Sequence, residues 1–445
     1  MTNELKGKVN YSVNENIAIL EVDNPPVNPL SSGVRAGLSE YIAKANNDES
    51  IEGIILTGAG RSFIAGADIS EFGQKPDGPD LHTALKEIEF SKKPVLAAIN
   101  GTALGGGLET ALVCNYRMGT NKAIVGLPEV NLGLLPGAGG TQRLPRLIGP
   151  SQALKMMIAG TPMSAKKALQ QGVIDAISEN SLMDDAIAFL QEKIGLDLNE
   201  HPKVRDKNEK VLEARGDDNV LSEAKALAAK TRRGQFAPGQ IIACVEAAIN
   251  EDDFDIGMKK ESEYFLECLI NPQREAMIHI FFGERAASKI SDIPKETPLL
   301  PINSAGIVGS GTMGGGIAMN FANAGIPVLV LDQDEKNLER GMGVIEKNYQ
   351  MMVDRGRMTQ EQKDMVLGLI TPTLSYEDLS DVDIAVEAVY ENLELKQEIF
   401  KSLDTVTKDH AILASNTSGL DIDAIASSTK RPGKVVGTHF FSPAN

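Results

Sequence analysis

The chain has 445 residues, of which 42% are hydrophobic and 24% are charged, and its formal net charge is −17. This length exceeds one ordinary domain and predicts two or three, and the composition is that of a globular protein with a large core. The acidic balance argues against nucleic acid as the main partner, and no apolar run is long enough for membrane insertion.

The cysteines and the first residues indicate a reducing compartment. Cys114, Cys244 and Cys268 form no disulfide or metal-binding pattern, so we expect no bound metal. The opening residues, MTNELKGKVNYSVNEN, lack the apolar segment of a secretory signal.

The N-terminal part alternates short apolar runs with an amphipathic pattern. Residues 16–22 (NIAILEV), 51–58 (IEGIILTG) and 93–100 (KPVLAAIN) are predicted strands, and residues 32–48 are a predicted helix. This alternation is typical of an α/β fold. From about Ser151 to Ala287 the strand signals fade and helical periodicity takes over.

Three short motifs in this part combine small residues with carboxylates. LGGGLE places three glycines before Glu109 between a predicted strand and helix, and AIVGLPEV brings Glu129 directly after a strand and a proline. Residues 65–68 (AGAD) form a further small-residue turn. Backbone amides at a helix N-terminus can hold an oxyanion, and two carboxylates suit proton transfer at the carbon beside a carbonyl. Tight packing alone would also explain such glycines, so the residue types leave both readings open.

The segments SFIAGADISEF, AINGTALGGGLE and PEVNLGLLPGAGGTQRLPRLIG resemble the crotonase, or enoyl-CoA hydratase/isomerase, superfamily. The resemblance implies that the amides of Ala67 and Gly106 form an oxyanion hole for an acyl-CoA thioester. Ala65 and Asp68 then belong to the same substrate-binding turn. Glu109 and Glu129 hold the water and move the protons. Because both glutamates are present, the resemblance favours a hydratase, with a secondary isomerase activity open to the pair.

The run GLLPGAGGTQR, residues 133–143, looks superficially like a phosphate loop. It lacks the Lys-Ser/Thr ending of a P-loop. We therefore expect it to line the acyl-CoA site, with glycines that are mostly structural.

Residues 291–303 (SDIPKETPLLPIN) contain three prolines and are the predicted linker to a second α/β unit. That unit opens with Gly309, Gly311 and Gly314 in G-x-G-x-x-G spacing between a predicted strand and helix. A second strand ends at Asp332, near the 20-residue distance of the dinucleotide-binding fingerprint. The acid favours NAD over NADP, because a 2′-phosphate would be repelled. The alternative is a surface aspartate that merely ends a strand.

Polar side chains follow three later predicted strands. The first strand is followed by Glu391 and Lys396, the second by Asn416 and Ser418, and the third by His439. The carboxyl ends of parallel strands share one edge of a sheet, so we expect these groups to gather there. A lone histidine is often structural, but at that edge it can act as a general base.

From about Ile302 to the end, the chain resembles the NAD-binding domain of L-3-hydroxyacyl-CoA dehydrogenases. The resemblance implies that His439 is the catalytic base and that Ser418 helps to hold the substrate hydroxyl. It implies cofactor contacts at the three glycines and at Met313, Asp332, Val389, Tyr390, Glu391, Lys396, Asn416 and Ser418. Ser442 stands where many relatives have Asn, which leaves one contact open.

The family's histidine is oriented by a glutamate about a dozen residues later, followed by a helical domain. This chain ends six residues past His439. We therefore expect a fragment of a longer protein, whose dehydrogenase half binds NAD yet turns over poorly.

The combined prediction is a crotonase-type spiral α/β domain (residues 1–190), a helical extension and linker helix (191–290), and a Rossmann-like NAD-binding domain (302–445). The whole resembles the multifunctional fatty acid β-oxidation enzymes of the peroxisomal bifunctional and bacterial α-subunit types. The expected reactions are hydration of trans-2-enoyl-CoA and NAD-dependent oxidation of the L-3-hydroxyacyl-CoA product.

Two alternatives stay open: a crotonase-type isomerase fused to an inactive NAD module, and a non-catalytic scaffold that binds acyl-CoA or RNA. The resemblance makes acyl-CoA the ligand and a thiolase subunit a candidate partner. The expected compartment is the cytoplasm of a bacterium or the peroxisome of a eukaryote. Acyl chain length and oligomeric state are left open by the sequence.

Overall fold

The computed structural model describes residues 5–71, 78–294 and 296–444. The chain forms two compact units, Met1–Ile290 (unit 1) and Ser291–Asn445 (unit 2), so the division falls at the start of the expected linker. The finer boundary near residue 190 stays a prediction. None of the helices in these ranges combines the length and apolar character needed to cross a bilayer.

The described residues of unit 1 form two β-sheets. The larger has the strand order β1-β2-β3-β5-β7-β10, in which only β1 and β2 pair antiparallel. Its strands are β1 (Lys8–Asn14), β2 (Ile17–Asp23), β3 (Gly53–Gly58), β5 (Val95–Ile99), β7 (Tyr116–Thr120) and β10 (Ala176–Ser178). The smaller sheet has the order β4-β6-β8-β9 and consists of β4 (Ser62–Ile64), β6 (Thr102–Leu104), β8 (Ile124–Gly126) and β9 (Met163–Ser164).

The strands β2, β3 and β5 confirm the three runs that the sequence predicted. Every residue of β3 and of β5 is buried, as expected for parallel strands that are covered on both faces. The largely helical region after Ser151 also holds the short strands β9 and β10, whose two and three residues are too few to give a periodic signal.

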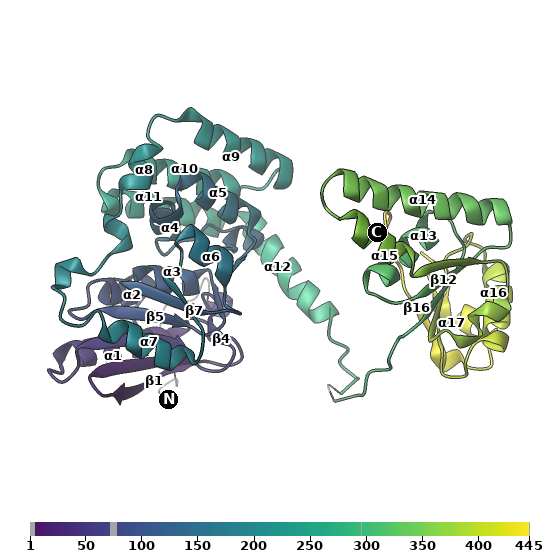
Figure 1. Ribbon diagram of the computed structural model, residues 1–445, viewed down its shortest axis with the longest axis horizontal. Helices are drawn as coiled ribbons and strands as arrows, with labels where there is room; N and C mark the ends of the chain where they lie inside the picture. The colour runs from purple at the N-terminus through teal and green to yellow at the C-terminus, as the bar shows by residue number, and fades with distance from the viewer. Residues whose placement is uncertain (1–4, 72–77, 295, 445) are drawn as a thin grey trace. The chain divides into compact units, whose positions relative to one another are not determined.

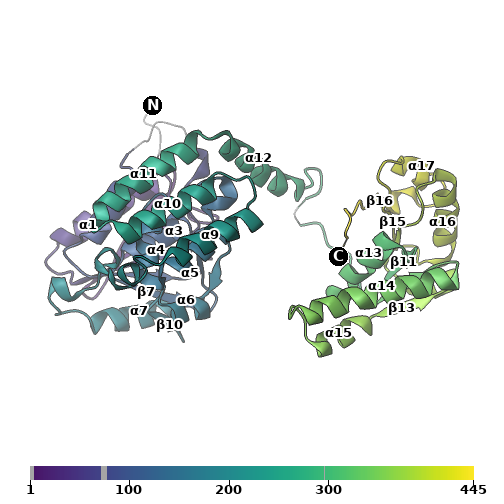
Figure 2. The ribbon, with the colours of Figure 1, turned by 90° about the horizontal axis from the view of Figure 1, so that it is seen from above.

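The helices of unit 1 form much of its mass. They are α1 (Ser32–Asn47), α2 (Leu81–Glu89), α3 (Gly106–Val113), α4 (Gly140–Ile148), α5 (Pro150–Ala159), α6 (Ala165–Gln171), α7 (Leu182–Gln191), α8 (Glu209–Glu213), α9 (Asp218–Thr231), α10 (Ala237–Asn250), α11 (Phe254–Ile270) and α12 (Pro272–Ala287). Helices α4, α5 and α8–α11 lie together on one side of the sheets (Figures 1 and 2). One continuous hydrophobic core runs from Val9 to Cys268, so the helical extension shares the core of the sheets.

Unit 2 is built around one six-stranded parallel sheet with the order β13-β12-β11-β14-β15-β16. Its strands are β11 (Ala305–Val308), β12 (Val328–Leu331), β13 (Ile370–Thr373), β14 (Ile384–Glu387), β15 (Ile412–Ser415) and β16 (Val435–Gly437). Its helices are α13 (Thr312–Asn323), α14 (Glu335–Asp354), α15 (Gln360–Leu367), α16 (Leu393–Val406) and α17 (Ile422–Ala426). Numbered from the first strand, the order is 3-2-1-4-5-6, the doubly wound order whose switch point binds dinucleotides.

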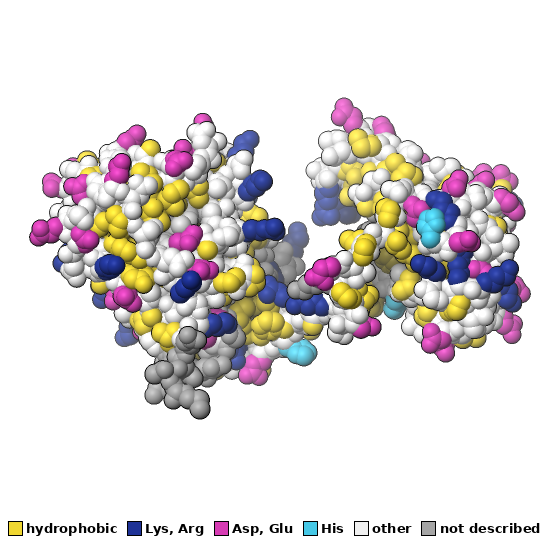
Figure 3. All heavy atoms as spheres, turned by 90° about the horizontal axis from the view of Figure 1, so that it is seen from below, with side chains coloured by type: hydrophobic (Ala, Val, Ile, Leu, Met, Phe, Trp, Pro, Cys, Tyr) yellow, Lys and Arg dark blue, Asp and Glu magenta, His cyan; other side chains and the backbone are white. Residues whose placement is uncertain are grey.

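The surface drawn in Figure 3 carries mixed charge. On this face of each unit, Lys and Arg side chains are interspersed with Asp and Glu. In unit 1 several apolar side chains on the late helices are exposed, among them Leu266, Ile270 and Ile280.

We predict that Gly107→Ala destabilises unit 1 by about 3 kcal/mol or more. A Cβ at Gly107 would lie 1.9 Å from the carbonyl oxygen of Ile64, and backbone cannot yield as a side chain can. Gly239, near the start of α10, has nothing within 4 Å of such a Cβ, so Gly239→Ala should change stability by less than about 1 kcal/mol. Urea unfolding of both variants checks this, and equal midpoints would contradict it.

Candidate active site

Unit 1 encloses a cavity of about 620 Å³, within the size range of small-molecule sites. The structure brings to its wall all the residues expected at the first site: Ala65, Ala67, Asp68, Gly106, Glu109 and Glu129. Leu134, Leu135, Gly137 and Ala138 of the run at 133–143 also line it, and that this cavity is the acyl-CoA site stays a prediction. Asp68 forms an ion pair with Lys6, whose Nζ lies 2.5 Å from the carboxylate.

The three glycines before Glu109 each meet a different neighbour. Gly105 has φ +54°, and a Cβ there would lie 2.9 Å from Oε1 of Glu129. A Cβ at Gly106 would lie 3.5 Å from the amide nitrogen of Ala67, and one at Gly107 would clash with the carbonyl of Ile64. The glycines therefore let this backbone approach a carboxylate, an amide and a strand at once.

The amides of Ala67 and Gly106 point to an anion-binding role. Gly106 is the first residue of α3, whose first N–H groups have no partner within the helix. In the turns, loops and caps of the described chain, neither amide donates a backbone hydrogen bond. Two such amides on one cavity can receive the oxygen of a bound carbonyl.

Glu109 lies in the first turn of α3 and is only 2% exposed. Its Oε1 accepts hydrogen bonds from the amides of Ala138 (2.7 Å) and Gly140 (2.8 Å). Burial raises the pKa of Glu109, while these two amides and the charge of Arg143 oppose the rise. The two donors favour the ionised form, which suits a general base.

Glu129 begins a short 3₁₀ helix, Glu129–Leu132, directly after Pro128. Among the described residues its buried Oε2 has no hydrogen-bond partner. Burial, followed by the charge of Glu109, raises the pKa of Glu129 well above its usual value. Of the two carboxyls, Glu129 thus has the stronger tendency to keep a proton, and its unpartnered oxygen lies at the wall of the cavity.

A third buried carboxyl, Glu261 on α11, was missed by sequence reasoning. Its Oε1 accepts from the amide of Gly139 at 2.7 Å, and its Oε2 accepts from the amide and hydroxyl of Thr141. Burial, followed by the charge of Glu109, raises its pKa to about 8. Its only sequence signal is its place on the apolar stripe of α11, four residues after the buried Gly257.

In unit 2 the glycine loop between β11 and α13 fits a dinucleotide. A Cβ at Gly314 would lie 1.8 Å from the carbonyl of Gly309, so helix and strand approach closely there. Gly309 has φ +103°, which favours glycine. Around Gly311 nothing lies within 4 Å of the Cβ position, which leaves room at the N-terminus of α13 for a pyrophosphate. Met313 is half-buried in the first turn of α13.

Asp332 follows β12 and is bonded into the same loop. Its Oδ2 accepts from the amide (3.0 Å) and the hydroxyl (2.6 Å) of Ser310. Burial opposes ionisation, but these bonds prevail and hold the pKa of Asp332 below its usual value. The carboxylate is thus charged and half-buried at the place where the fold binds an adenosine ribose.

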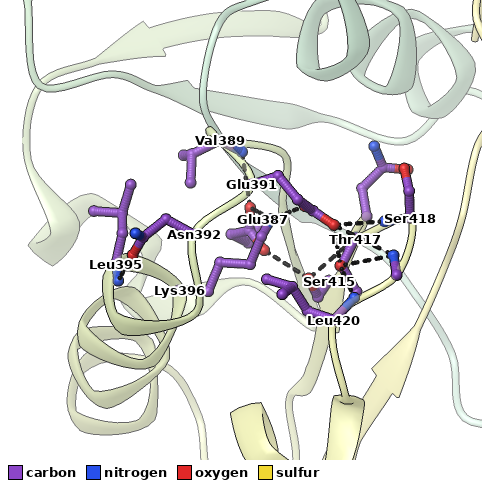
Figure 4. A network of polar contacts seen from close by, with 12 residues as sticks. Glu387, Val389, Glu391, Asn392, Leu395, Lys396, Ser415, Thr417, Ser418 and Leu420 are labelled. Carbon is purple, nitrogen blue, oxygen red and sulfur yellow. Dashed lines mark hydrogen bonds and ion pairs between the residues drawn. The ribbon is translucent and has the colours of Figure 1, made fainter.

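Glu391, Lys396 and Ser418 meet at the carboxyl edge of β14 and β15 (Figure 4). Oε1 of Glu391 accepts from the amide of Ser418 at 3.0 Å, and its Oε2 lies 3.3 Å from Nζ of Lys396. Nζ of Lys396 also lies 2.6 Å from Oε1 of the fully buried Glu387. The ammonium of Lys396 is thus paired with two carboxylates, and its side chain is only 1% exposed. A contact between Lys396 and NAD stays a prediction.

Sequence reasoning also missed Glu387, because it is the last residue of an apolar strand and no motif marks it as a site residue. Its carboxylate accepts from the amide of Val389 (2.8 Å) and from the hydroxyl of Ser415 (2.6 Å). Together with Lys396, these bonds connect the ends of two adjacent strands. Tyr390, beside them, is 82% exposed.

His439 follows β16 at the same edge of the sheet. Oδ1 of Asn416 accepts from the amide of Phe440, which ties the segment of His439 to the end of β15. The imidazole is exposed and packs near the ring of Phe441, with centroids 4.9 Å apart. Within the described ranges it makes no hydrogen bond or ion pair, so its role as a base stays a prediction.

Two families match the chain. Residues 12–226 match the enoyl-CoA hydratase/isomerase family, and residues 304–445 match the family described as 3-hydroxyacyl-CoA dehydrogenase, NAD binding domain. These matches confirm the expected fold class, a crotonase-type α/β domain followed by a Rossmann-like domain.

Three relatives illustrate the similarity. The chain is 39% identical over 437 residues to a peroxisomal bifunctional enzyme of Cavia porcellus and 40% identical over 438 residues to one of Homo sapiens; both alignments cover 96% of the chain and 59% of the relative. It is 35% identical over 449 residues to a peroxisomal fatty acid beta-oxidation multifunctional protein of Arabidopsis thaliana, with coverage of 97% and 61%. The chain thus spans about three fifths of the length of these relatives.

We predict that Lys396→Met destabilises unit 2 by about 3–5 kcal/mol, because it leaves Glu387 charged, buried and without its ammonium partner. Lys401→Met, on the exposed face of the same helix, should cost less than about 0.5 kcal/mol. Adding Glu387→Gln to Lys396→Met should recover part of the loss. Urea unfolding measures all three, and a Lys396→Met protein as stable as the Lys401→Met control would contradict the prediction.

Proposed function

We propose a function from one premise: the chain joins a member of the enoyl-CoA hydratase/isomerase family, over residues 12–226, to an NAD-binding domain of the 3-hydroxyacyl-CoA dehydrogenase family, over residues 304–445. Unit 1 adds water to trans-2-enoyl-CoA to give L-3-hydroxyacyl-CoA. Unit 2 binds NAD for the oxidation of that product to 3-ketoacyl-CoA. The chemistry is that of fatty acid β-oxidation.

The observation that carries the hydratase is the glutamate pair on one cavity with the two amides. Glu109, oriented by two amides that favour its ionised form, takes a proton from water as the water oxygen bonds to the β-carbon. The electron pair of the double bond moves toward the thioester, whose oxygen gains negative charge. The amides of Ala67 and Gly106 support this charge, a contribution of roughly 3 kcal/mol per donor in other enzymes. Glu129 then gives its proton to the α-carbon.

The dehydrogenase proposal rests on the carboxyl edge of the sheet in unit 2. NAD, when bound, supplies the hydride acceptor. Gly311 and the N-terminus of α13 would hold its pyrophosphate, and Asp332 its adenosine ribose. His439 would take the proton of the substrate hydroxyl, which Ser418 helps to hold, with Asn416 fixing the segment of His439.

Partner and compartment follow from the same chemistry. A 3-ketoacyl-CoA is the substrate of a thiolase, so a thiolase subunit is the partner we propose. The thiols of Cys114, Cys244 and Cys268 are free and buried, which suits a reducing compartment. We propose the peroxisome of a eukaryote, by analogy with the names of the relatives, or the cytoplasm of a bacterium.

We predict that Glu109→Gln and Glu129→Gln each lower kcat for hydration of crotonyl-CoA by about 10²–10⁴-fold, because each removes one proton-transfer group. The loss of absorbance of the enoyl thioester measures the rate. Glu179→Gln, on an exposed loop, is the matched control and should leave the rate unchanged. If one of the two variants keeps nearly full hydration activity, the assignment of proton transfer to both glutamates is wrong. If the unchanged protein does not hydrate crotonyl-CoA at all, a non-catalytic binding scaffold becomes the better assignment.

We predict that Asp332→Asn raises the Kd for NADH about tenfold or more, because a charged acceptor for the ribose hydroxyls is lost. The preference for NADH over NADPH should narrow at the same time, since the repulsion of a 2′-phosphate is removed. Fluorescence titration with both nucleotides measures the affinities. Asp354→Asn, at the exposed end of α14, serves as control, and an unaltered NADH affinity in Asp332→Asn would refute the assignment.

A further inference from the structure

The start of α4 binds two carboxylates at once. Its four amides from Ala138 to Thr141 alternate: those of Ala138 and Gly140 donate to Glu109, and those of Gly139 and Thr141 donate to Glu261. A change that moves one carboxylate must therefore move the peptide units that hold the other.

Glu261 is itself fixed by its surroundings. It is fully buried, and its second oxygen also receives the hydroxyl of Thr141. That hydroxyl accepts from Nε2 of Gln142, which also donates to the carbonyl of Cys244 on α10. Gly257 lies one turn before Glu261 and leaves room for the side chain of Gln142. A Cβ at Gly257 would lie 2.3 Å from Oε1 of Gln142. Helices α10 and α11 are thus both hydrogen-bonded to the first turn of α4.

The charged and titratable groups that face Glu261 come from four elements: Glu109 of α3, Glu129 of the 3₁₀ helix, Arg143 of α4 and Cys244 of α10. Arg143 lowers the pKa of Glu261, while its own guanidinium is bonded to Glu89 by two hydrogen bonds of 2.8 and 2.7 Å. Burial and the charge of Glu109 are the main causes that raise the pKa of Glu129, and Glu261 adds to the rise when it is ionised.

We propose that Glu261 is a positioning residue for the glutamate pair: through Gly139 and Thr141 it fixes the turn whose intervening amides orient Glu109 in the cavity. Helix α11, which lies beyond the part of the chain that matches the hydratase/isomerase family, thereby becomes part of the catalytic apparatus. The catalytic part of this inference rests on the proposed hydratase function. The positioning of Glu109 does not.

The test compares Glu261→Gln with Glu263→Gln, an exposed glutamate on the same helix. Glutamine keeps the shape but places an NH₂ group where one acceptor stood, so bonds to Thr141 or Gly139 are lost. Amide hydrogen exchange at residues 138–141 should accelerate in Glu261→Gln, including at Ala138 and Gly140, which do not touch Glu261. Glu263→Gln should exchange like the unchanged protein.

Hydration kinetics supply the second readout. In Glu261→Gln, kcat should fall about tenfold to a hundredfold with KM within about twofold, because the base is misplaced while substrate contacts remain. Above about pH 8, where Glu261 is ionised, its charge helps Glu129 to keep its proton. Glu261→Gln removes this charge, so the alkaline limb of the kcat/KM profile should shift to lower pH, which a purely structural role would not cause.

The proposal is overturned if amide exchange at Ala138 and Gly140 is the same in Glu261→Gln as in the unchanged protein. It is also overturned if the unchanged protein hydrates normally and Glu261→Gln has the same kcat and pH profile. If the unchanged protein fails to hydrate, the proposed function is wrong, and the exchange data alone still decide whether Glu261 positions Glu109. Should Glu261→Gln fail to fold, Thr141→Val, which removes the hydroxyl bonds to Glu261 and Gln142 but keeps the backbone amide bonds, should show the same changes at smaller size.

Discussion

Desolvation of carboxyl groups is the constraint on which unit 1 depends. A carboxylate taken out of water is strongly destabilising unless N–H donors surround it. In unit 1 these donors are consecutive backbone amides at the start of α4, where the helix dipole also favours negative charge. The segment PGAGGT is rich in small residues because its backbone, not its side chains, must reach the carboxylates.

Unit 2 meets the same constraint with a different solution. There a buried ammonium, Lys396, lies between two carboxylates, Glu387 and Glu391, and each of these also accepts hydrogen bonds from the loops that end the strands. The arrangement fixes the edge of the sheet where cofactor and substrate are expected to meet. Rigid placement of such groups is what catalysis by proximity requires.

Many residues of the two candidate sites could be named from the sequence because they stand in local motifs. Glu109, Glu129 and the turn at residues 65–68 follow strands and stand beside small residues, and Asp332 stands at a fixed distance from its glycines. Glu261 and Glu387 could not be found in this way. One is a single acid among several on a helix, and the other ends an apolar strand, so neither stands in a recognisable motif, and partners on other elements reveal their importance.

The contact between Gly139 and Glu261 joins residues 122 positions apart, within a core that runs unbroken from the first strands to α11. During synthesis, the ribosome must therefore release α11 before the cavity of unit 1 can acquire its final wall. Such long-range closure is slow compared with local helix formation. The nascent unit thus spends time with a partly open, apolar interior, a state on which chaperones act.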